Sequence, residues 1–199
     1  MIFINLGGLG GCRVTDIMIN LGIKKETYPY DWIFSNQNFV IDSILSNGSN
    51  FFIFEDSYVV STQHLISPNK NAALVHDFYG DFNEKKDIII NKYKRRIDRL
   101  FNAINTQEEI LFIRDIVDTP EHRLPYFEKV DVPGYQIESD DIIKWDAFIT
   151  KINEKNYNCK LLLLSRNNNL KSNSPNIEIF NYVHNNFDDV NKFIKDKYL

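Results

Sequence analysis

A cysteine directly follows a glycine-rich turn near the start of the chain. Residues 7–11 read GGLGG, and Cys12 opens the helical pattern that comes next. A thiol at a helix N-terminus is shifted toward the nucleophilic thiolate. The backbone N–H groups of Gly10 and Gly11 can bind an anion, or the oxyanion that forms when a thiolate attacks a carbonyl. The pattern therefore predicts a nucleophile with its own anion site, whereas the alternative is a small, buried, unreactive cysteine.

A nucleophilic cysteine needs a base, and histidine is the usual one. Of the 4 histidines, His76 lies in the sequence AALVHDF, at the end of a predicted strand. Asp77 should point to the opposite face of that strand, which makes it a poor partner for the imidazole. Asp115 ends the next predicted strand, in LFIRD, and is our candidate for the group that orients His76. The alternative for His76 is an ordinary core or surface histidine.

Other patterns of functional sites are weaker in this chain. The dinucleotide-binding pattern GxGxxG fits Gly8 and Gly10 but meets Arg13 at its third glycine, and the phosphate-loop ending GK[ST] does not occur. Neither HExxH nor CxxC occurs, so we expect no metal site and no cofactor. Asp31 stands among aromatic residues in YPYDW. It is either a buried capping acid or a residue that contacts the substrate.

These residues need a scaffold, and strands alternate with helices along most of the chain. Apolar runs predict strands at residues 2–6, 109–116, 160–165 and 177–182. Helical spacing predicts a helix after Cys12 that ends at Gly22, a second between Asn36 and Gly48, and others at residues 84–105, 139–153 and 188–198. Residues 120–134, with three prolines, are predicted to form a loop.

The alternation predicts an α/β fold, a single three-layer domain over residues 1–199 with a mixed, mostly parallel sheet. Residues 51–62 and 72–78 break the alternation, because both read as strands and no helical pattern lies between them. We expect these two segments to form an antiparallel group.

The composition of the chain argues against nucleic acids and membranes as binding partners. The formal net charge is −4, which does not suit a protein that neutralises nucleic-acid phosphates. The chain has 2 cysteines, too far apart for a metal motif and too few for a disulfide framework. No apolar run reaches the roughly 18 residues of a membrane span. We therefore expect a cytoplasmic protein without nucleic-acid or membrane partners, and its oligomeric state stays open.

Several motifs, taken in order, resemble one known family. It is a domain-of-unknown-function family described as papain-like cysteine peptidases, and the resemblance spans residues 2–116. Residues 117–199 are similar to it only in the alternation of strands and helices. The motifs are Gly11-Cys12, YPYDW at 28–32, VHDF at 75–78, KYKRRI at 92–97 and LFIR at 111–114.

The resemblance implies that Cys12 is a nucleophile and His76 its base, with Asp31, Asp77 and Arg114 as further motif positions of unassigned role. It also implies an α+β papain-like fold as the alternative architecture. Together with the residues themselves, it favours a thiol hydrolase or acyltransferase that acts on an amide, ester or thioester of a small-molecule or peptide substrate. The rival hypothesis is a noncatalytic, Rossmann-like domain that binds a phosphate or a nucleotide sugar.

Overall fold

The main sheet is parallel and carries the N-terminal strand at one edge. The computed structural model describes residues 1–8, 11–51, 58–61, 64–66, 72–74, 81–116, 139–155, 157–167, 169–183 and 187–199. In this part of the chain, four strands pair in parallel in the order β1-β6-β7-β8. They are β1 (Ile2–Gly8), β6 (Ile110–Asp115), β7 (Cys159–Ser165) and β8 (Ile177–Asn181).

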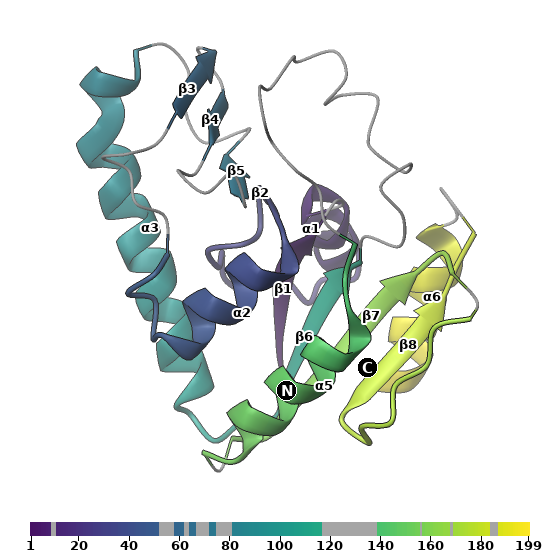
Figure 1. Cartoon of the computed structure of the whole chain (residues 1–199). Coiled ribbons are helices and arrows are strands. Elements are labelled where there is room, and N and C mark those ends of the chain that lie inside the picture. Colours follow the sequence, from purple (N-terminus) through teal and green to yellow (C-terminus); the bar gives the residue numbers. More distant parts are fainter. Residues whose placement is uncertain are drawn as a thin grey trace.

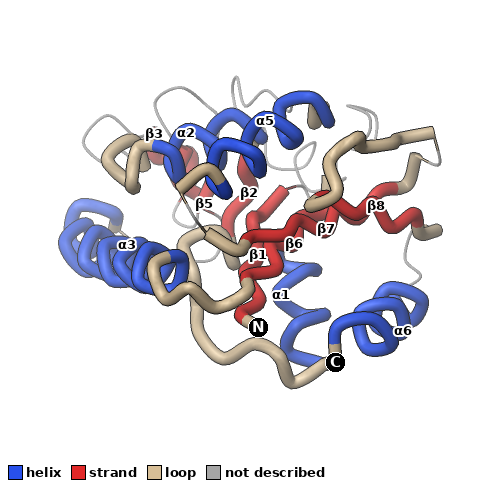
Figure 2. The backbone as a smooth tube through the Cα atoms, turned by 90° about the horizontal axis from the view of Figure 1, so that it is seen from below, coloured by secondary structure: helices blue, strands red, loops and turns tan. Residues whose placement is uncertain are grey.

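Both faces of this sheet are covered by helices, as Figure 2 shows. Successive side chains point to opposite faces, so Ile4 and Phe112 belong to one core cluster, and Phe3 and Leu111 belong to the other. One cluster is covered by α2 (Gln37–Leu45), α3 (Phe82–Ile104) and α5 (Ile142–Asn153), and the other by α1 (Gly11–Asn20) and α6 (Phe187–Tyr198). The predicted three-layer α/β class is confirmed. Burial on both faces explains why the run LLLL in β7 is apolar without alternation.

A second, smaller sheet is antiparallel (Figure 1). Its order is β2-β5-β4-β3, with β2 (Ile33–Ser35), β3 (Tyr58–Ser61), β4 (His64–Ile66) and β5 (Ala72–Leu74). The antiparallel group expected from residues 51–62 and 72–78 forms, but their strands β3 and β5 both pair with β4, a strand that the sequence did not predict. These strands form a sheet of their own, and the short strand β2, which the sequence did not predict, pairs with β5 at its edge.

The helices begin and end where capping residues allow. Asp81 and Asp141 cap α3 and α5, because each side chain accepts a hydrogen bond from a backbone N–H two residues later. Gly22 follows α1 with φ of 69°, the left-handed conformation predicted for its position. The helices of the described residues include none long and apolar enough to cross a membrane. The predicted loop at residues 120–134 lies outside the described residues.

Candidate active site at the carboxyl edge of the parallel sheet

The parallel strands bring their carboxyl ends to one edge of the main sheet, and α1 begins at that edge (Figure 1). Gly8 at the end of β1 lies opposite Asp115 at the end of β6, and Asp115 lies opposite Leu164 of β7. Open α/β sheets bind their ligands at this edge. The position is therefore suited to a reactive residue.

Cys12 is the second residue of α1 and lies at this edge. The prediction that Cys12 stands in the first turn of a helix is confirmed. Its side chain is half-buried, and it forms no disulfide. Cys159, at the start of β7, differs because it is only 1% exposed and burial raises the pKa of its thiol to about 12. Cys12 is thus the more accessible of the two thiols.

The two glycines that end β1 are held tightly against their neighbours. Gly8 has φ of 106°, and a Cβ atom there would lie 2.1 Å from the carbonyl oxygen of Asp115. At Gly7, with φ of 71°, a Cβ atom would lie 2.5 Å from Oγ of Ser35. The Gly7 N–H donates to Oδ1 of Asn5 at 2.7 Å. Glycine is therefore required at both positions, and the end of β1 is fixed relative to β6 and β2. Gly11 begins α1, and Gly10 lies outside the described residues.

Asp115, opposite Gly8, belongs to a mostly buried group that we call the arginine cluster, which consists of Arg13, Asp115, Arg166 and Tyr182. Nη2 of Arg166 is 3.2 Å from both carboxylate oxygens of Asp115. The Tyr182 hydroxyl donates to Oδ1 at 2.8 Å, and Nη1 of Arg13 lies 3.8 Å from Oδ2. Burial first, and then the charge of Asp115, raise the pKa of Tyr182. The Asp115 carboxylate therefore lies among two guanidinium groups and a phenol.

The predicted partner of Asp115, His76, lies outside the described residues, as does Asp77. The expectation that Asp115 orients His76 therefore stays a prediction. Sequence reasoning missed Arg166 and Tyr182, although a signal was present. Each stands at the end of a predicted strand, and the ends of parallel strands meet at one edge. Among the described residues, no group of His, Cys, Asp and Glu side chains is arranged to hold a metal ion.

Arg114 points to the opposite face from Asp115 and is completely buried. Its Nε and Nη2 donate to the two oxygens of Asp140 at 2.7 and 2.8 Å. It also donates to the carbonyl oxygens of Leu6 and Ser35, both at 3.0 Å, and its guanidinium lies over the ring of Trp145. These contacts join β6 to β1, to β2 and to the segment before α5, so Arg114 has a structural role behind the site.

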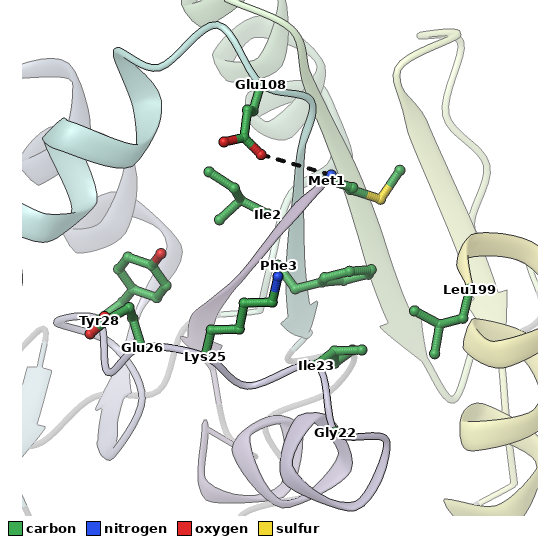
Figure 3. A pocket seen from close by; sticks show the side chains of 10 residues that line it. All are labelled: Met1, Ile2, Phe3, Gly22, Ile23, Lys25, Glu26, Tyr28, Glu108 and Leu199. Carbon is green, nitrogen blue, oxygen red and sulfur yellow. Dashed lines mark ion pairs between the residues drawn. The ribbon is translucent and has the colours of Figure 1, made fainter.

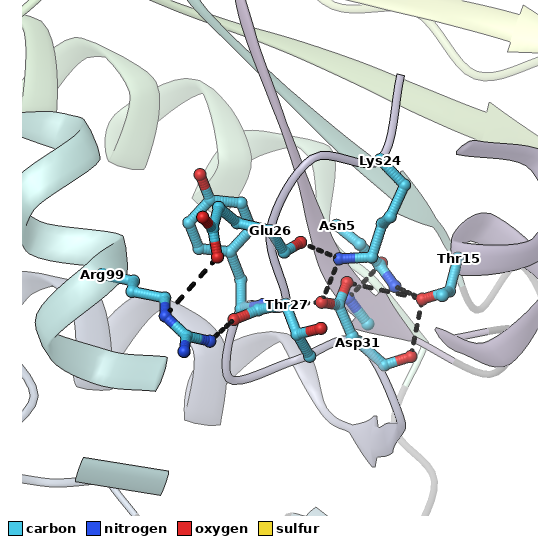
Figure 4. Close-up of polar contacts among 9 residues, drawn as sticks. Asn5, Thr15, Lys24, Glu26, Thr27, Asp31 and Arg99 are labelled. Atoms are coloured by element: carbon cyan, nitrogen blue, oxygen red, sulfur yellow. Dashed lines mark hydrogen bonds and ion pairs between the residues drawn. The ribbon is translucent and has the colours of Figure 1, made fainter. Parts of the chain in front are cut away.

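Asp31 is fully buried and connects the loop of residues 21–32 to α1 (Figure 4). It accepts a hydrogen bond from the Tyr28 N–H at 2.6 Å and forms an ion pair with Lys24. The Thr15 hydroxyl donates to its backbone carbonyl at 2.7 Å. Burial raises the pKa of the Asp31 carboxyl, and the charge of Lys24 offsets part of that shift. These are the contacts of a buried capping acid, the first of the two interpretations of this residue.

A pocket of about 430 Å³ lies at the other end of β1 (Figure 3). Ile2, Phe3 and Ile23 line it together with the charged side chains of Lys25 and Glu26. The strand β1 rises about 3.3 Å per residue, so its two ends are roughly 20 Å apart. Cys12 follows the far end of the strand, and this pocket is therefore not the cleft of the thiol.

Comparisons with known proteins match much of this chain. A family model described as "Putative papain-like cysteine peptidase (DUF1796)" matches residues 1–132. The uncharacterized protein R408 of Acanthamoeba polyphaga mimivirus is 30% identical over 138 residues, covering 57% of this chain and 61% of that protein. The chain thus spans less than two thirds of this relative's length. No solved structure matches.

Proposed function

The chain belongs to the family described as papain-like cysteine peptidases, and from this premise we propose that it is a thiol hydrolase or acyltransferase whose nucleophile is Cys12. The observation that carries the proposal is the position of Cys12. It is a half-buried thiol in the first turn of a helix, four residues after the tightly packed Gly8 that ends β1, at the carboxyl edge of a parallel sheet. The helix N-terminus favours the thiolate over the thiol.

In the proposed reaction, the Cys12 thiolate attacks the carbonyl carbon of an amide, ester or thioester. The N–H groups at the start of α1, from Gly11 and Cys12, stabilise the oxyanion that forms, with Gly10 as a further donor. His76 takes the thiol proton and then gives it to the leaving group. The resulting thioester on Cys12 is released by water or by an acyl acceptor. The role of His76 follows from the family motif VHDF, whose histidine it is.

Alkylation tests the thiolate, and the chain contains its own control. We expect iodoacetamide to modify Cys12 in the folded protein, with a pH midpoint below the value of about 8.5 for an ordinary thiol, while Cys159 stays unmodified. Peptide mass spectrometry separates the two sites. Modification of Cys12 only after unfolding, or at the rate of an ordinary thiol, contradicts the proposal.

Hydrolysis of a panel of amides, esters and thioesters then tests the reaction class. Cys12→Ala should abolish turnover, and Cys159→Ala should retain it, because Cys159 is buried at the amino end of β7. His76→Gln should lower kcat and remove the acidic limb of the pH profile. An active Cys12→Ala protein rules out the thiol mechanism.

The rival hypothesis is a noncatalytic domain that binds a phosphate or nucleotide sugar. The parallel sheet with its glycine turn is the observation in its favour, since such turns bind phosphates in other α/β proteins. A rise in Tm with nucleotide sugars, together with an unreactive Cys12, would support it.

A further inference from the structure

The arginine cluster at the carboxyl edge is built around two guanidinium groups. Within the described residues it holds two guanidinium groups, from Arg13 and Arg166, and one carboxylate, from Asp115. The side chain of Arg166 is 6% exposed and that of Asp115 is 2% exposed. A buried charge is costly unless an opposite charge accompanies it. Of the two arginines, Arg13 is the more exposed, so a further negative group can approach it from solvent.

The Arg13 guanidinium marks where such a group would bind. Its Nη1 is buried and has no hydrogen-bond partner among the described residues, and its ion-pair distance to Asp115 is 3.8 Å. Buried donors are almost always hydrogen-bonded. The rest of the side chain reaches solvent, since 19% of it is exposed, and it lies over the ring of Phe187. Arg13 is thus held in place with one buried donor to which the described residues supply no hydrogen-bond acceptor.

Arg13 is also adjacent to the proposed nucleophile. Cys12 and Arg13 are consecutive residues of α1, and consecutive helical residues point about 100° apart. The Arg13 side chain therefore leaves α1 in a different direction from the Cys12 thiol. A group bound there belongs to a part of the substrate that is a few atoms away from the carbonyl.

We infer that Arg13 and Arg166 form a subsite for an anionic group, a carboxylate or a phosphate, on the substrate that Cys12 attacks. This inference rests on the proposed function. Guanidinium groups match both anions geometrically, because their N–H donors form a planar fork. Arg166 and Tyr182 lie outside residues 1–132, so the C-terminal part of the chain supplies a specificity determinant that the family match does not cover.

Two alkylating reagents test the subsite. Iodoacetate and iodoacetamide are nearly equal in size and attack the same sulfur, but only iodoacetate is an anion. The ratio of their rate constants at Cys12 therefore reports the charge near the sulfur, and changes in thiolate fraction cancel. Arg13→Gln and Arg166→Gln should each lower the iodoacetate-to-iodoacetamide ratio about two- to sixfold, as expected for the loss of one partly screened charge.

Two control variants separate the effect of the removed charge on the rate ratio from general changes in the reactivity of Cys12. Arg166→Lys keeps the charge and should keep the ratio. Arg99→Gln makes the same substitution on α3, far from Cys12, and should also leave the ratio unchanged. Arg99 pairs with Glu26, which lines the pocket at the other end of the sheet (Figure 4). If Arg166→Gln does not fold, Arg13→Gln provides the test, because Arg13 is partly exposed. A ratio that neither glutamine variant changes overturns the subsite while the proposed thiol chemistry stands.

Anion binding gives a second readout that does not need a reactive thiol. Inorganic phosphate or succinate, compared with chloride at equal ionic strength, should raise Tm in the wild-type protein and not in Arg13→Gln. The more effective anion tells phosphate from carboxylate recognition. If Cys12 reacts with neither alkylating reagent, the proposed function fails, and these Tm values alone decide the subsite. Equal Tm in all the salts then overturns it.

Discussion

Replacing Arg114 should strongly destabilise the protein, because this guanidinium connects four segments in the interior. It is 0% exposed and forms two hydrogen bonds with Asp140 and two with backbone carbonyl oxygens. In Arg114→Met, the Asp140 carboxylate stays buried without this cation. Breaking a buried ion pair from one side costs about 3–5 kcal/mol. We expect the free energy of unfolding to fall by that amount, which is a large part of the roughly 5–15 kcal/mol of a typical domain.

Removing the second charge should restore part of this loss. Asp140→Asn keeps the shape of the side chain and removes the buried negative charge, so the double variant should be more stable than the sum of the two single losses predicts. Urea unfolding at pH 7 measures all four proteins, and equal m-values make the comparison valid. If Arg114→Met lowers the free energy of unfolding by less than about 1 kcal/mol, or if the two effects simply add, the assignment of Arg114 as a structural connector is refuted.

Two further predictions concern glycines with positive φ and the buried carboxyl group of Asp31. In Gly22→Ala the free energy of unfolding should fall only by the roughly 1–2 kcal/mol that a left-handed conformation costs alanine, because no atom lies within 4 Å of a Cβ there. In Gly8→Ala it should fall further, because the Cβ would lie 2.1 Å from the carbonyl oxygen of Asp115. Equal shifts in Tm for the two variants would contradict this. Because burial raises the pKa of Asp31 above 3.8, the folded state binds a proton more tightly than the unfolded state does. The stability of the wild type relative to Asp31→Asn should therefore increase as the pH falls through the folded pKa toward 3.8, and a decrease, measured by urea unfolding across this range, would contradict the assigned shift.

The position of Cys12 could be predicted from sequence because it depends on neighbours in the chain. The glycines before it and the helical spacing after it are local features, and the helix formed as expected. The same holds for the end of α1 at Gly22 and for the alternation that defined the α/β class. In contrast, β2 is only three residues long and pairs with a distant strand, so no local pattern distinguished it from a loop.

The arginine cluster could not be predicted in the same way. Arg166 is 51 residues from Asp115 in sequence, and Tyr182 is 67 residues from it. The parallel register of β6, β7 and β8 brings the three together. A sequence shows that several strands end in polar residues, but it does not show the order in which the strands pair.

The sequence by itself determined the class of the fold, the thiol in the first turn of its helix and the family to which the motifs belong, since these depend on local spacing and residue type. Only the tertiary structure decided that Arg114 joins buried segments, that Asp31 caps a buried loop and that two arginines surround Asp115. The physical reason is that hydrogen bonds and ion pairs act over about 3–4 Å. Their partners are therefore fixed by strand order and register, which long-range packing sets.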